Sequence, residues 1–95
     1  MGSLQPERHR VIESYLRAAG FIETKTGISM EIDMTINEFM RMTAPRLNGA
    51  ARSFADLTLL AEQSLYSQQE ITPQDTAAAE DCTKSLFEQL RDGNK

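Results

Sequence analysis

Side chains that could act as a nucleophile or a general base are few in this chain. His9 is the single histidine and Cys82 is the single cysteine. A thiol nucleophile needs a base within hydrogen-bond reach, but His9 lies between two arginines near the chain end, where we expect solvent. Cys82 falls on the apolar stripe of a predicted helix beside Asp81, and burial and a nearby carboxylate both raise a thiol pKa. We therefore predict no catalytic residues and a structural role for Cys82.

The sequence also lacks the ligand sets of common metal and cofactor sites. Zinc sites use sets of cysteine and histidine, and one residue of each type cannot supply such a set. The acidic residues between positions 70 and 81 lack the spacing of a calcium loop and its central glycine. No two of the five glycines lie close together, so no phosphate-binding loop is present. We therefore predict no metal and no cofactor, and we expect that this domain is not an enzyme.

Methionine is the residue type that points to binding. The segment from residue 30 to residue 42 carries four methionines, namely Met30, Met34, Met40 and Met42. Methionine-rich surfaces bind varied partner helices because the thioether side chain repacks readily, but the same side chain also fills irregular cores. We interpret most of the cluster as core. Met42 lies off the apolar stripe, so it is the first candidate contact for a protein partner, with Met34 and Arg46 as further candidates.

The charge is unevenly distributed along the chain. The net charge is −4, with seven basic and six acidic side chains in residues 1–52, and three basic and eight acidic in residues 53–95. The two parts therefore carry +1 and −5. Acidic surface repels phosphate, so we expect no nucleic-acid partner.

Apolar periodicity predicts an all-α fold, mainly a compact bundle of four helices. The predicted helices cover residues 6–19, 36–47, 54–66 and 73–91. Three of them begin at a capping residue, which is Thr35, Ser53 or Thr72. Glu38 follows Thr35 by three residues and completes the pattern of a capping box. The apolar stripe of the third helix includes Leu57, Leu60 and Leu65.

Residues 21–34 follow a different pattern. Gly20 is typical of the position just after a helix, so we predict that the first helix ends there. The apolar residues beyond it alternate with polar ones at the period of a strand, and they are Ile28, Met30, Ile32 and Met34. We interpret this segment as an extended connector whose apolar side covers the core. The alternative is a short hairpin that turns at Thr26-Gly27 and lies on the helices.

The length of the chain suits one helical domain over residues 1–95, with loose ends at 1–5 and 92–95. No run approaches the ~20 apolar residues that span a bilayer, so we expect no direct membrane insertion of this segment. The dipeptide Gly2-Ser3 is typical of a cloning remnant. We therefore expect the chain to be a fragment of a longer protein.

The order of these features carries a resemblance. A helix that ends at Gly20 is followed by the capped start Thr35-Ile36-Asn37-Glu38-Phe39. The third helix ends at Leu65-Tyr66-Ser67, and Ile71-Thr72-Pro73-Gln74-Asp75 opens a last helix rich in alanine. Over about residues 7–91, this order resembles the uncharacterised C-terminal domain of membrane-associated transglutaminase-like proteins of bacteria and archaea. The chain departs from that pattern at Ile36, where the family tends to have proline, and at Ser67, where it tends to have glycine.

The resemblance implies where the domain lies in its parent protein, and it assigns no catalytic residues to the domain. In such proteins, membrane helices and an extracytoplasmic transglutaminase-like domain with its own Cys-His-Asp set precede this domain. The domain would then lie on the cytoplasmic side of the membrane, as part of an integral membrane protein. We expect a non-enzymatic accessory domain, with an interaction or regulatory role, whose partner is another protein or the rest of the parent chain.

A free-standing helix-turn-helix regulator is the alternative. The second and third helices would form the motif, with Arg46 and Arg52 near phosphates and a turn over residues 48–52. However, the candidate recognition helix at 54–66 contains no arginine or lysine.

Overall fold

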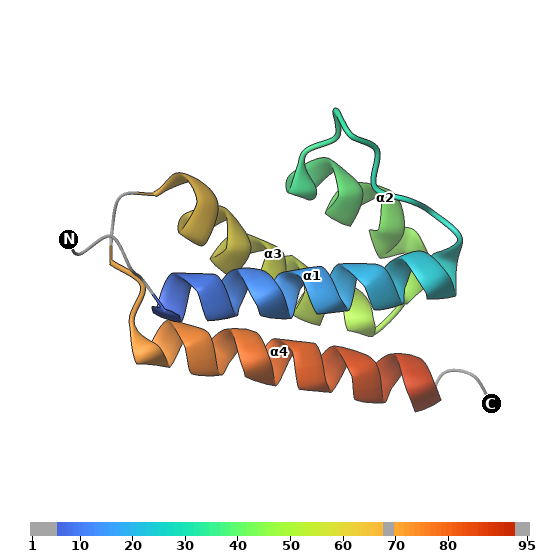
Figure 1. The fold of residues 1–95 in the computed structure, drawn as a ribbon. Helices are drawn as coiled ribbons and strands as arrows, with labels where there is room; N and C mark the ends of the chain where they lie inside the picture. The colour runs from blue at the N-terminus through green and yellow to red at the C-terminus, as the bar shows by residue number, and fades with distance from the viewer. Residues whose placement is uncertain (1–5, 68–69, 93–95) are drawn as a thin grey trace.

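Four helices in chain order make up the computed structural model, which describes residues 6–67 and 70–92. They are α1 (Pro6–Thr26), α2 (Ile36–Leu47), α3 (Ala50–Tyr66) and α4 (Pro73–Asp92). As Figure 1 shows, α1 and α4 lie side by side and run in the same direction, and α3 runs back against them. The shorter α2 packs mainly on α3 and makes fewer contacts with α1. The described residues contain no strand, so the predicted all-α bundle of four helices is confirmed.

An aromatic contact holds three of the helices together. Phe54 of α3 is completely buried, and its ring stacks on Tyr15 of α1 at a centroid distance of 5.7 Å. The ring of Phe39 of α2 meets Phe54 edge-on at 6.0 Å. Burying side chains of this size stabilises a fold by about 1.5–3 kcal/mol each, so this cluster contributes strongly to the packing of α1, α2 and α3.

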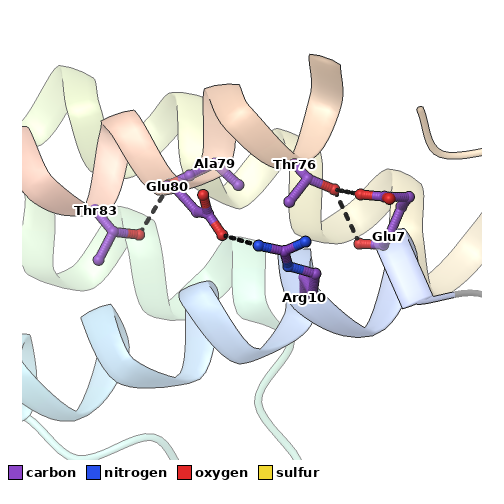
Figure 2. A network of polar contacts seen from close by, with 6 residues as sticks. All are labelled: Glu7, Arg10, Thr76, Ala79, Glu80 and Thr83. Atoms are coloured by element: carbon purple, nitrogen blue, oxygen red, sulfur yellow. Dashed lines mark hydrogen bonds and ion pairs between the residues drawn. The ribbon is translucent and has the colours of Figure 1, made fainter. Parts of the chain in front are cut away.

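A polar seam fixes α4 along α1 (Figure 2). Thr76 donates from its hydroxyl to the carbonyl oxygen and the carboxylate of Glu7, at 3.3 and 2.5 Å. One turn further, Arg10 pairs with Glu80 at 3.3 Å. Further along, the hydroxyl of Thr83 donates to the Ser14 carbonyl oxygen of α1, 3.5 Å away. Because these contacts advance together along both helices, they set the register of α4 on α1.

The first helix continues past Gly20 to Thr26, so the prediction that it ends at Gly20 is wrong. The reason is packing beyond the glycine. Ile22 is completely buried, and the ring of Phe21 meets that of Phe87 at 4.7 Å. This burial outweighs the roughly 1 kcal/mol that glycine costs inside a helix. The left-handed glycine after the helix is Gly27, with φ 76°, whose amide donates to the Glu23 carbonyl at 2.9 Å.

Gly20→Ala is expected to raise the free energy of unfolding by about 0.5–1 kcal/mol, because alanine is the better helix residue. Gly20 is exposed, and a Cβ atom there would meet nothing within 4 Å. Urea denaturation followed by circular dichroism measures the change. Gly27→Ala is the matched control, and its positive φ predicts a loss of stability instead. A loss for Gly20→Ala would mean that α1 does end at this glycine.

The connector is shorter than predicted and is not a hairpin. It runs from residue 27 to residue 35, because residues 21–26 belong to α1. Its apolar side chains at Ile28, Met30 and Met34 are partly buried and pack against the core, as the connector interpretation expected. The Met30 amide donates to the carboxylate of Glu23 at 2.7 Å, which ties the connector to α1. The strand-like alternation therefore reflects a chain that lies along the bundle and pairs with no second strand.

Two of the three predicted caps are confirmed. The Thr35 hydroxyl accepts from the Glu38 amide at 3.1 Å, and the Glu38 carboxylate accepts from the Thr35 amide at 2.9 Å. Thr72 and Asp75 exchange the same pair of hydrogen bonds at the start of α4. The predicted cap at Ser53 is wrong, because α3 begins three residues earlier at Ala50, which is buried.

Candidate functional site

The predicted contact residues Met34 and Met42 line one hollow in the surface. It lies between the end of the connector and the exposed side of α2, is open to solvent, and has a volume of about 490 Å³. We call it the connector hollow, and its lining residues are Asp33, Met34, Glu38, Arg41 and Met42. The structure therefore brings together two of the three residues that the sequence suggested for partner contact.

Local sequence explains how the connector hollow is shaped. The capping box at Thr35 fixes the start of α2 directly after Met34. Phe39 and Thr43 are completely buried beneath α2, so the helix face that carries Met42 points to solvent. Met42 is 50% exposed, whereas Met34 is partly buried and packs against the core. One methionine is thus anchored against the core, whereas the other is half-exposed to solvent.

Ile32 stands beside the connector hollow as a fully exposed apolar side chain. A tight turn places it there, because the Met34 amide donates to the Glu31 carbonyl at 3.1 Å and leaves Ile32 and Asp33 at the tip. The sequence did not single out Ile32 as a contact, since it alternates in phase with three residues that face the core. The turn reverses this phase, and the only signal in the sequence is the acidic residue on each side of Ile32.

Arg46, the third predicted contact, does not line the connector hollow. It follows Met42 by one turn of α2, and its guanidinium donates to the Thr26 carbonyl at 3.4 Å. Thr26 is the last residue of α1, where carbonyl groups lack helical partners and a cation is favourable. The structure therefore gives Arg46 a role at the end of α1.

The surroundings of the connector hollow are acidic. Asp33 and Glu38 line it and Glu31 lies at the adjoining turn, whereas Arg41 is the single basic side chain in its lining. Three carboxylates and one guanidinium give this region a net charge of −2. None of these four side chains forms an ion pair within residues 6–67 and 70–92. Their charges are available to a ligand, although one Glu38 oxygen already accepts from the Thr35 amide.

His9 and Cys82 do not form a reactive pair. His9 lies 3.5 Å from Glu13 on the exposed side of α1. Cys82 is partly buried in α4, and its pKa is raised by burial and then by the nearby carboxylates of Asp56 and Asp81. No hydrogen bond in the described part of the chain joins the two side chains. A raised pKa lowers the thiolate fraction, so this cysteine is poorly suited to nucleophilic attack.

A second hollow lies over the α1–α4 seam and has a volume of about 310 Å³. Its walls carry charges of both signs, and they include Arg17, Lys84 and Arg91 together with Glu80 and Glu88. Mixed charge of this kind is typical of a solvated groove between helices. Figure 2 shows that Glu80, on this side of α4, is already paired with Arg10.

The hydroxyl of Tyr15 is a buried polar group in the core, and such groups can mark a functional site. Its hydroxyl has no hydrogen-bond partner within the described residues, and the same holds for the buried Ser64 hydroxyl. Burial raises the pKa of Tyr15 far above its usual value, and the carboxylates of Glu62 and Glu23 add to this rise. Because its ring stacks on Phe54, we assign Tyr15 to the core.

The α2–α3 junction differs from the turn that the alternative helix-turn-helix interpretation requires. Only Asn48 and Gly49 separate the two helices, whereas the motif commonly uses a turn of about three or four residues. The earlier start of α3 brings Arg52 into this helix. Beyond Arg52, the exposed side of α3 carries large apolar residues, including Leu59 and Tyr66.

No helix within the described residues combines the length and the apolar character needed to cross a membrane. The same part of the chain holds no group of three or more histidine, cysteine, aspartate or glutamate side chains arranged for a metal ion. Comparison with family models, curated proteins and solved structures finds no match to this chain.

Proposed function

We propose that this chain is a non-enzymatic accessory domain that binds a protein, or another part of its parent chain, through the connector hollow and Ile32. The main support for this proposal is that Met34 and Met42 both line the connector hollow, beside the fully exposed Ile32. Apolar side chains grouped on a surface and rimmed by polar ones are typical of interaction sites. Methionine supports such a role because it adapts its shape to a partner.

We further propose that the parent is a membrane-associated transglutaminase-like protein, with this domain at its C-terminus on the cytoplasmic side. The support is the order of sequence features, together with capped helix starts at Thr35 and Thr72. In that setting, the Cys-His-Asp chemistry belongs to another domain of the parent. The natural reading frame upstream of Leu4 tests this parentage, and a start codon there without encoded membrane helices would contradict it.

Met42→Glu is expected to weaken partner binding while leaving the fold intact, because Met42 is half-exposed and contributes little to the core. The measurement compares what the immobilised variant and the unchanged protein retain from a membrane extract of the source cells. Leu59→Glu is the matched control, since Leu59 is 58% exposed on α3, away from the connector hollow. Equal retention by the Met42 variant and the unchanged protein would argue against this surface.

A further inference from the structure

The turn beside the connector hollow carries a side chain that the fold does not use. Ile32 lies at its tip and is fully exposed, although such turn positions favour proline and small polar residues. Building on the proposed interaction role, we propose that the connector hollow binds a segment with an apolar side chain flanked by lysine or arginine. The apolar side chain would lie among Ile32, Met34 and Met42, and the cation would pair with Asp33.

The apolar half of this proposal rests on the arrangement of the three side chains. Met34 is anchored against the core, Met42 is half-exposed on α2, and Ile32 projects from the turn two residues before Met34. A partner side chain placed in the connector hollow would therefore meet one fixed and one adaptable thioether. Ile32 would become covered at the edge, which removes apolar surface from water and favours binding.

The charged half rests on complementarity. Asp33 and Glu38 both line the connector hollow, and Glu31 adds a third carboxylate on the other side of Ile32. Arg41 is the single opposing charge in the lining. A lysine or arginine beside the apolar anchor would meet carboxylates without displacing an existing ion pair, whereas an acidic segment would be repelled.

Charge also disfavours two other occupants. A membrane surface rich in anionic lipid would be repelled by Glu31 and Asp33, which flank the apolar tip. A second copy docked by twofold symmetry on this same face would bring the acidic turns of the two molecules together. A separate basic and apolar segment avoids both of these repulsions.

Two fluorescent synthetic peptides of equal length test the proposal on the whole chain, one built from leucine and lysine and the other from leucine and glutamate. Fluorescence anisotropy is expected to show binding of the leucine–lysine peptide alone. Ile32→Ser and Asp33→Lys should each weaken this binding by about tenfold or more. Leu59→Ser is the control and should bind like the unchanged protein. Because Ile32 and Asp33 are both exposed, the variants should keep the thermal midpoint of the unchanged protein.

Several results would overturn the proposal. Equal binding of the two peptides would remove the charge argument, and an equal loss with Leu59→Ser would remove the location. Ile32-dependent binding to vesicles of anionic lipid, or an Ile32-dependent dimer in sedimentation, would identify a different occupant. If the leucine–lysine peptide does not bind but Met42→Glu still reduces retention from a membrane extract, the partner chemistry is wrong and the interaction role remains.

Discussion

Phe54→Ala is expected to lower the free energy of unfolding by about 3–5 kcal/mol, the range for a buried phenylalanine cut back to alanine. Phe54 is completely buried, and its ring meets Tyr15 at 5.7 Å and Phe39 at 6.0 Å. One substitution therefore removes the contact shared by α1, α2 and α3. Small domains are stable by only about 5–15 kcal/mol in total, so this loss is a large share of the stability of the fold.

Urea denaturation followed by circular dichroism measures this loss. Leu59→Ala on the same helix is the control, because Leu59 is exposed and should cost less than about 0.5 kcal/mol. A Phe54→Ala variant that loses less than about 1 kcal/mol would contradict the packing of these three helices.

Leu57→Ala is expected to lower the free energy of unfolding by about 2–5 kcal/mol, because Leu57 is completely buried in the core. The matched substitution is Leu60→Ala, one turn further along α3. Sequence periodicity places both leucines on the buried stripe, but the structure leaves Leu60 only partly buried. Leu60→Ala should therefore cost clearly less than Leu57→Ala, since less apolar surface is lost to water.

Thermal and urea unfolding of the two variants, made in the same background, give this ranking directly. A larger loss for Leu60→Ala would mean that α3 is rotated about its axis relative to the structure. Equal losses at both positions would mean that the stripe is as wide as the sequence alone suggested.

Sequence patterns predicted the helices well wherever apolar period and capping agree. The predicted bounds of the second helix match α2, which runs from Ile36 to Leu47 with both halves of its capping box formed. The start of α4 was equally clear, because Thr72 and Asp75 satisfy each other's backbone amides. Local signals of this kind act within one turn of helix, so they can be read without knowing the tertiary contacts.

The errors lie where tertiary packing outweighs local preference. Gly20 is a reasonable helix end by local chemistry, but the buried Ile22 keeps α1 helical through it. Ser53 is a good capping residue, yet α3 begins three residues earlier at Ala50, because Ala50 is buried in the helix packing. Leu65 has the right period for the core and is nevertheless exposed near the end of α3. These outcomes depend on which helix packs where, and periodicity alone does not contain that information.

The candidate site was only partly predictable for the same reason. Met42 was identified because it falls off the apolar stripe of α2, and the structure does expose it. Ile32 was missed because a turn changes the direction of its side chain without changing the alternation in sequence. Arg46 was assigned to partner contact, but its bond to the Thr26 carbonyl joins two segments twenty residues apart.

The central claim is that the connector hollow is an interaction surface. The most direct test of this claim is to locate a bound peptide on the chain. Backbone amide chemical shifts of the ¹⁵N-labelled chain, recorded with and without the leucine–lysine peptide, would locate it. We predict that the perturbed amides cluster between Glu31 and Met42, and that the shift changes are clearly smaller in Ile32→Ser at the same peptide concentration. Perturbations centred on the α1–α4 seam around Arg17 and Lys84, with the connector unchanged, would contradict the account.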